Sequence, residues 1–208
     1  MTALAEQLPR IFQANLDRLF VRVIQPTMDA LMLHPVLEQG EAASMSEFLD
    51  RAAAQVDNYT ANEAAKSFVL TLAGVFERQL SIWTTATGLT DLAKLRGFQE
   101  QLLAGAQYAS LDLAIDDLGA EINEMFTVAN VVRHGEGPSC EGLRVMAPAL
   151  WDNTAADYID LVPGPRRPSE TLRIRRNDLV RYVRATTRFW GRADPLPMAV
   201  TNPPYWLS

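Results

Sequence analysis

A helix-type hydrophobic periodicity runs through the first 135 residues and limits the possible folds more than any other feature of the chain. Apolar side chains recur at intervals of three and four residues over 4–24, 45–58, 60–88 and 110–134, the spacing that places them on one face of an α-helix. Amphipathic helices bury such faces by packing against one another. The sequence therefore predicts an all-α protein, built as an antiparallel helical bundle.

Capping residues and breakers set the expected helix boundaries. Pro26 is expected to interrupt the first helix, because proline lacks the backbone N–H that an α-helix needs, and a short second helix is expected to follow, to about Leu37. Ser44 is followed three residues later by Glu47, and Thr60 by Glu63. A Ser or Thr followed at that distance by Glu is the capping-box pattern. Two separate helices are therefore predicted here, starting near residues 45 and 60.

The composition changes after the fourth long periodic segment. Nine of the twelve prolines lie in the last 73 residues, where a continuous bundle is not expected. We predict a helical bundle over residues 1–138 and a C-terminal extension over 139–208. The extension is expected to pack on the bundle without forming an independent domain. It is predicted to contain a small strand pair, at 158–162 and 171–174, and a terminal helix.

Charge and cysteine content exclude several classes of protein. Residues 1–138 carry 9 basic and 18 acidic side chains and residues 139–208 carry 10 and 7, giving formal charges of −9 and +3. A basic coat over the whole chain, for nucleic acid or membrane, is excluded. The single cysteine, Cys140, cannot form an internal disulfide. Without a leader or an apolar run near 18 residues, we expect a reduced, cytoplasmic protein that does not enter a membrane.

Basic side chains concentrate in one segment near the end of the chain. Residues 165–192 contain nine arginines and only two acidic residues. In one interpretation they contact phosphates, and Arg173, Arg175 and Arg176 are then the candidate RNA-binding residues. Alternatively, the segment pairs with the acidic helical bundle. The sequence leaves both interpretations open.

The sequence lacks the residue patterns of several kinds of catalytic and binding site. His34, His134 and Cys140 show no paired metal-ligand spacing, and the chain has no Glu-x-x-His motif. It also has no glycine-rich phosphate loop after a predicted strand and no nucleophile elbow around a serine. We therefore predict neither a metal site nor a cofactor.

The end of the last long predicted helix holds the strongest candidate for chemistry. Asn130 and His134 lie one turn apart and share a helix face, with Arg133 beside them and Gly135 at the expected helix end. A histidine that exchanges a proton, an amide donor and a guanidinium are the groups needed to cleave RNA without metal. Basic residues before a glycine also form an ordinary helix cap, and this alternative stays open.

These residues resemble the motif of the HEPN superfamily. The motif is an arginine, a polar residue that is often asparagine, three further residues and a histidine. Asn130 and His134 match it, while Ala129 occupies the arginine position. The resemblance extends to the segment VFERQL at 75–80 and to the arginine-rich segment 171–190. It implies a small helical bundle that dimerises. Many members are metal-independent ribonucleases of toxin, anti-phage and RNA-processing systems, and others are non-catalytic.

The resemblance suggests roles for individual residues. His134 would act as acid or base and Asn130 would orient the RNA. Because Ala129 cannot contact the scissile phosphate, Arg133 or Arg78 would supply the missing charge, and Glu77 would orient Arg78 or His134. The expected function is metal-independent endoribonuclease activity across a homodimer groove, in bacterial defence or a toxin–antitoxin system. The alternative is an inactive module that dimerises and binds RNA, an antitoxin or another protein.

Overall fold

The computed structural model describes residues 4–38, 40–89, 97–152 and 156–205. These residues contain helices and no strand, which confirms the all-α class. The α-helices are α1 (Leu4–Leu19), α2 (Gln25–Ala30), α3 (Met45–Ala86), α4 (Phe98–Tyr108), α5 (Leu118–His134), α6 (Pro138–Met146), α7 (Tyr158–Leu161) and α8 (Arg176–Ala193). None of these described helices is both long and apolar enough to cross a bilayer.

The first helix does not stop at Pro26 as predicted. A π-helical turn, Phe20–Ile24, lies between α1 and α2, and the N–H of Gln25 bonds the carbonyl of Phe20 five residues back. The Thr27 hydroxyl donates to the carbonyl of Val23 at 2.7 Å. The wider turn carries the chain past the proline, since a π-helical turn shifts the register of the carbonyls. Helical structure therefore continues to Ala30.

Helix α3 replaces the two helices predicted over 45–58 and 60–88. Ser44 caps it as expected, because its hydroxyl accepts the N–H of Glu47. The second capping-box pattern, at Thr60, lies inside an uninterrupted helix of 42 residues. A Thr-x-x-Glu sequence also fits a helix interior, and alanine-rich sequence on both sides of Thr60 favours continuation.

Helix α5 begins eight residues later than predicted. Ser110 does not cap it, since its φ is 54° and a turn and the 3₁₀ helix Ile115–Asp117 follow. The end of α5 agrees with the sequence. Gly135 has a φ of 72°, a conformation in which glycine has no steric penalty, and its N–H bonds the carbonyl of Val131 at 2.8 Å.

The predicted strand pair is not present in the described residues. Residues 158–161 form the short helix α7. The extended segment 172–174 pairs with a side chain instead of a strand. Asn62 of α3 donates to the carbonyl of Leu172 and accepts the N–H of Ile174, both at 3.0 Å. One buried amide therefore takes the place of a neighbouring strand.

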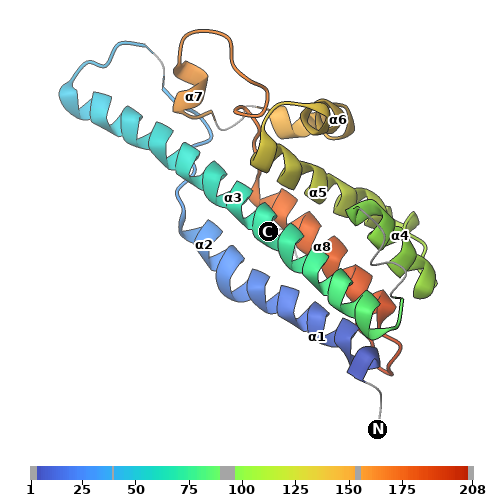
Figure 1. Ribbon diagram of the computed structural model, residues 1–208. Coiled ribbons are helices and arrows are strands. Elements are labelled where there is room, and N and C mark those ends of the chain that lie inside the picture. Colours follow the sequence, from blue (N-terminus) through green and yellow to red (C-terminus); the bar gives the residue numbers. More distant parts are fainter. Residues whose placement is uncertain (1–3, 39, 90–96, 153–155, 206–208) are drawn as a thin grey trace.

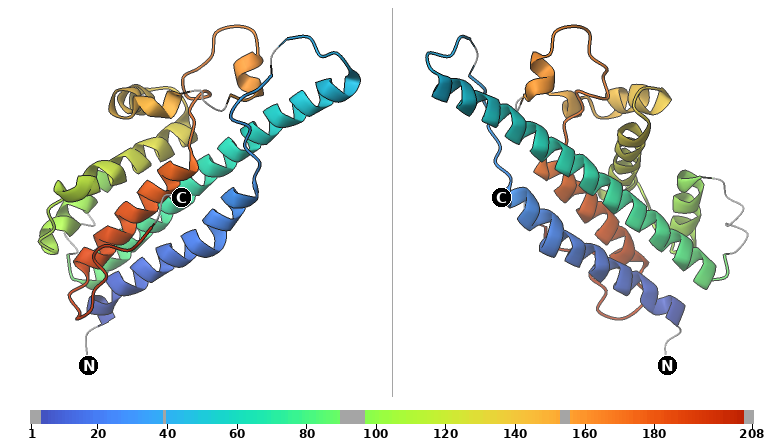
Figure 2. Two further views of the ribbon diagram at one scale, coloured as in Figure 1. Left: turned by 180° about the vertical axis from the view of Figure 1, so that it is seen from behind. Right: turned by 60° about the vertical axis from the view of Figure 1, so that its left-hand side comes forward.

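The terminal helix α8 lies inside the bundle and does not extend it. Figures 1 and 2 show α8 beside α1, α3 and α5, running in the direction of α3 and opposite to the other two. Trp190 and Phe189 of α8 are fully buried, and the Trp190 ring lies 5.0 Å from Phe12 and 5.4 Å from Trp83. Leu172, Ile174 and the buried residues of α8 therefore supply a central part of the core.

Candidate functional site

The predicted catalytic residues Asn130, Arg133 and His134 lie in the last two turns of α5, outside the cavity that opens beside the helix end. Arg133 and His134 are exposed and Asn130 is partly buried on the preceding turn. Neither the His134 nor the Arg133 side chain has a hydrogen-bond or ion-pair partner among the described residues. A nearby cavity of about 220 Å³ reaches Val132 and Gly135 and does not include His134.

Arg78 and Glu77 lie far from His134 within one chain. The rings of Phe76 in α3 and Phe126 in α5 have centroids 6.5 Å apart, so these residues lie level. His134 is eight residues beyond Phe126, and Arg78 is two residues beyond Phe76 in the opposite direction, because the helices run in opposite directions (Figure 1). At 1.5 Å per residue, about 15 Å of helix separates the two positions. One chain therefore does not assemble the expected catalytic group.

The three candidate RNA-binding arginines are all engaged by carboxylates. Arg173 is buried, and its Nη2 lies 2.7 Å from Asp160 and 3.2 Å from Asp157. Arg175 pairs with Asp152 at 3.4 Å, and Arg176 pairs with Asp29 at 2.9 Å. The pairs of Arg175 and Arg176 are partly exposed, while that of Arg173 is not. These arginines form internal contacts rather than an open basic surface.

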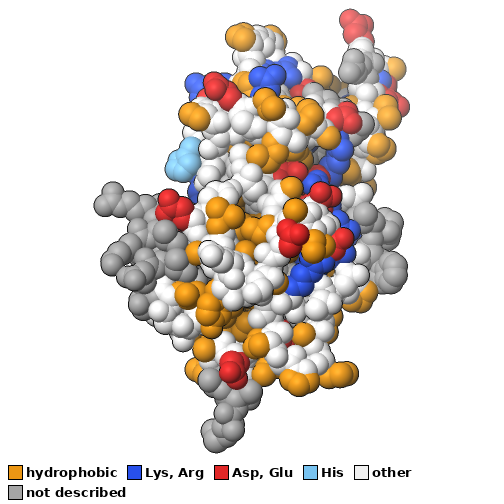
Figure 3. All heavy atoms as spheres, turned by 90° about the vertical axis from the view of Figure 1, so that its right-hand side faces the viewer, with side chains coloured by type: hydrophobic (Ala, Val, Ile, Leu, Met, Phe, Trp, Pro, Cys, Tyr) orange, Lys and Arg blue, Asp and Glu red, His pale blue; other side chains and the backbone are white. Residues whose placement is uncertain are grey.

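The rest of the arginine-rich segment follows the same pattern. Arg181 binds Glu124 at 2.9 Å and Glu121 at 3.3 Å, and Arg184 binds Glu121 at 3.1 Å. Tyr182 donates its hydroxyl to Glu124, and burial together with that carboxylate raises the pKa of Tyr182. On the face shown in Figure 3, basic side chains lie beside acidic ones and form no continuous patch. The structure favours the internal-pairing interpretation of the arginines.

The first thirteen residues of α3, 45–57, here called the arm, project beyond α1, α5 and α8 (Figure 1). The first buried residue of α3 is Asn58. Met45, Leu49 and Val56 share one face of the arm and expose 73%, 57% and 52% of their surface. Exposed apolar residues at helical spacing are characteristic of interaction surfaces.

The other side of the arm is covered by its own chain. Arg51 pairs with Glu38 at 3.3 Å and also with Glu47, so it ties the preceding loop to the helix. Asn58 holds the base of this loop, since its amide accepts the N–H of His34 at 2.7 Å and donates to the same residue's carbonyl at 2.8 Å. These contacts fix the arm's orientation and leave its apolar stripe facing outward.

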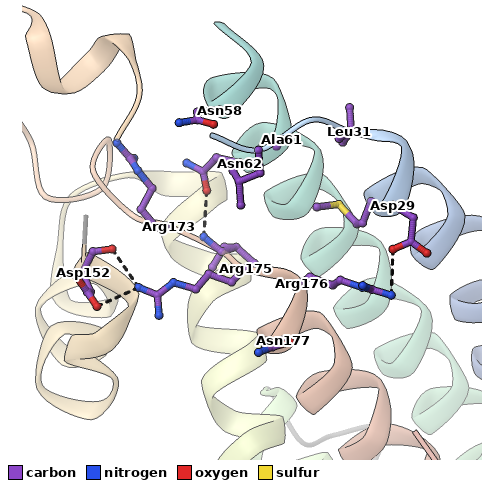
Figure 4. Close-up of a pocket in the computed structure, with 13 residues that line it drawn as sticks. Asp29, Leu31, Asn58, Ala61, Asn62, Asp152, Arg173, Arg175, Arg176 and Asn177 are labelled. Atoms are coloured by element: carbon purple, nitrogen blue, oxygen red, sulfur yellow. Dashed lines mark hydrogen bonds and ion pairs between the residues drawn. The ribbon is translucent and has the colours of Figure 1, made fainter. Parts of the chain in front are cut away.

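A larger cavity, of about 420 Å³, lies between α2, α3 and the start of α8 (Figure 4). Asn58 and Asn62 project from α3 on one side, and Arg175 and Arg176 border it at the start of α8. Sequence reasoning did not single out either asparagine. Asn62 contacts Leu172 and Ile174, and Asn58 contacts Ala156 as well as His34, which is 24 residues away. No local pattern marks such contacts.

Comparisons with known proteins identify no relative of this chain. No protein-family model, curated protein or solved structure matches the chain. The function is therefore inferred from the arrangement of the chain's own residues.

Proposed function

We propose that this protein is an interaction module that binds an amphipathic helix of another protein along its arm. This corresponds to the non-catalytic alternative suggested by the HEPN resemblance. The observation that carries the proposal is the exposed stripe of Met45, Leu49 and Val56 on a helix segment without any buried residue. A helix with such a stripe gains stability when a second helix covers it.

The charges around the stripe specify the partner. Residues 31–57 contain five acidic residues against one arginine, Arg51, and one histidine, His34, whose Nε2 lies 3.1 Å from Asp57. Asp50 and Asp57, seven residues apart, border one edge of the stripe, since that spacing returns to nearly the same side of a helix. Two arms packed antiparallel would bring these carboxylates against their counterparts, which is unfavourable. A partner helix flanked by Lys or Arg fits the surface, and a second copy of this chain does not.

Two synthetic peptides test this proposal. Both carry the same leucine stripe, and their polar positions are Lys in one and Glu in the other. Fluorescence anisotropy should show binding of the Lys peptide and none of the Glu peptide. Val56→Asp should weaken binding at least tenfold, although its added charge attracts the Lys peptide, because the apolar contact is lost.

Ile82→Asp is the matched control, since Ile82 lies on the same helix outside the arm and is equally exposed, at 52%. This variant should bind as tightly as wild type. Equal binding of both peptides, or equal loss in both variants, would overturn the proposal. Sedimentation of the free protein provides a separate check, because self-association that Val56→Asp abolishes would identify a second copy as the occupant.

A metal-independent ribonuclease is the second candidate function. It is favoured by the exposure of His134 and Arg133 side by side at the end of α5. Cleavage of single-stranded RNA in the presence of EDTA should then be lost in His134→Ala and retained in His34→Ala, which alters the other histidine. Cleavage at the wild-type rate by His134→Ala would rule this candidate out.

A further inference from the structure

The 420 Å³ cavity at the start of α8 is separate from the outward-facing stripe of the arm. Cavities of about 300–1,000 Å³ are the size that small molecules occupy in proteins. In Figure 4 it opens between the end of α2, the middle of α3 and the first residues of α8. Its wall on these elements is mostly apolar, formed by Met28, Leu31, Leu33, Ala61 and Ile174. This wall suits the hydrocarbon or aromatic body of a ligand.

Most polar groups around the cavity are already used by the protein. Asn58 bonds the backbone of His34 and Ala156, and Asn62 bonds that of Leu172 and Ile174. These amides therefore hold the walls in place, and little hydrogen-bonding capacity is left for a ligand.

Arg175 has donors to spare. Its Nη2 bonds the carbonyls of Ala149 and Asp152 and the Asp152 carboxylate, at 3.0–3.4 Å. Its Nε and Nη1 have no partner among the described residues. Since 42% of the Arg175 side chain and 57% of the Asp152 side chain are exposed, this ion pair contributes little and can rearrange. A ligand carboxylate that takes the place of Asp152 can then bind two N–H groups of the guanidinium, since both of its paired N–H edges include Nη2.

The remaining charges limit how much negative charge the cavity accepts. Arg175 and Arg176 are balanced by Asp152 and Asp29, and Arg173 is engaged by Asp157 and Asp160, which do not line the cavity. A polyanion such as a phosphate ester would lie close to Asp29 and Asp152 and be repelled. The first turn of α8, an 18-residue helix, adds only a partial positive charge. A single negative charge is therefore the best match.

We propose that this cavity binds a small monocarboxylic acid with an apolar body, with Arg175 receiving the carboxylate and Met28, Leu31 and Ile174 enclosing the rest. Met28 lies in α2 and Leu31 directly follows it, while Ile174 and Arg175 directly precede α8. This proposal does not depend on the helix-binding function of the arm.

Octanoate, octan-1-ol and octylammonium test the proposal, because they share one hydrocarbon chain and differ in charge. Isothermal titration calorimetry on the full chain should show one octanoate per protein, bound at least tenfold more tightly than octanol. Octylammonium should bind more weakly still. Equal affinities for octanoate and octanol, tighter binding of octylammonium, or no binding of octanoate would overturn the proposal.

Variants locate the site. Arg175→Ala should weaken octanoate binding at least fivefold and leave octanol binding unchanged. Arg188→Ala is the control and should change neither, because this α8 guanidinium contacts Asn202 in the segment after the helix. Leu33→Asp places a charge at an exposed residue of the cavity wall. It should weaken the binding of both octanoate and octanol without affecting folding. Val56→Asp should leave octanoate binding intact. Loss of octanoate binding in Val56→Asp would place the ligand on the arm and overturn the assignment.

Discussion

The two parts of α3 have the same helical pattern and opposite surroundings. In residues 58–86 the apolar stripe includes Val69, Leu72 and Phe76, all fully buried. In the arm, Met45, Leu49 and Val56 repeat the spacing and remain more than half exposed. The difference lies in the neighbours, because α1, α5 and α8 cover only the second part (Figures 1 and 2). Stability therefore depends on one part of the helix, and recognition of a partner is proposed for the other.

The largest expected effect is on stability, and it concerns two phenylalanines of α3 that differ in burial. Phe76 is fully buried and contacts the rings of Phe189 and Trp190, whereas Phe48 of the arm is 58% exposed. Phe76→Ala should lower the free energy of unfolding by about 3–5 kcal/mol, because it leaves a cavity in the core. Phe48→Ala should change it by less than about 0.5 kcal/mol. Urea denaturation measures both, and similar losses would show that the arm is part of the cooperative core.

The same contrast between buried and exposed positions applies to two ion pairs, those of Arg173 and Arg175. Arg173→Ala should cost about 3–5 kcal/mol of unfolding free energy, since the buried carboxylate of Asp157 loses its counter-charge and Asp160 keeps only Arg166. Arg175→Ala removes the partly exposed ion pair with Asp152 and should lower the free energy of unfolding by less than about 1 kcal/mol. Denaturation of both variants provides the measurement. An equally small loss in the two would mean that Arg173 is solvated in solution.

A smaller effect is expected at the amide that replaces a strand. Asn62→Ala leaves the carbonyl of Leu172 and the N–H of Ile174 without their partner, which should cost about 1–3 kcal/mol. Hydrogen exchange should become faster at the Ile174 amide. Gln55→Ala, in the arm, should change neither the free energy of unfolding nor the exchange rate of the Ile174 amide. Unchanged exchange at Ile174 in Asn62→Ala would show that the extended segment is held by other contacts.

The smallest expected effect is a pH dependence at the end of α5. Hydrogen bonds from the side chain and backbone of Ser169 lower the pKa of Glu136. A lowered folded-state pKa gives a contribution to stability that is present above the unfolded-state pKa and lost as the pH falls through the folded-state value. Wild type should therefore lose slightly more stability than Glu136→Gln between about pH 6 and pH 3.

Thermal unfolding at several pH values would detect this difference. Glu141→Gln, which alters an exposed carboxylate of the next helix, is the control and should follow wild type. Parallel curves for wild type and Glu136→Gln would show that the Ser169 contact does not persist in solution.

Local signals in the sequence located several elements correctly. The cap at Ser44 and the stop at Gly135 are both present, because each depends on residues within about four positions. The π-helical turn before Pro26 and the continuity of α3 through Thr60 were missed, since a proline or a capping pattern gives only a local preference. Asn58 and Asn62 were missed for the opposite reason, because they act on distant backbone.

The amino-acid sequence by itself determined that this chain is helical and which faces of its helices are apolar, since helix periodicity and capping act over one or two turns. Only the tertiary structure decided that α8 lies at the centre of the bundle and that its arginines meet the carboxylates of other elements. It also decided that one apolar stripe of α3 is covered and the other exposed. Burial and ion pairing depend on residues brought together from distant parts of the chain, and a local pattern cannot specify them.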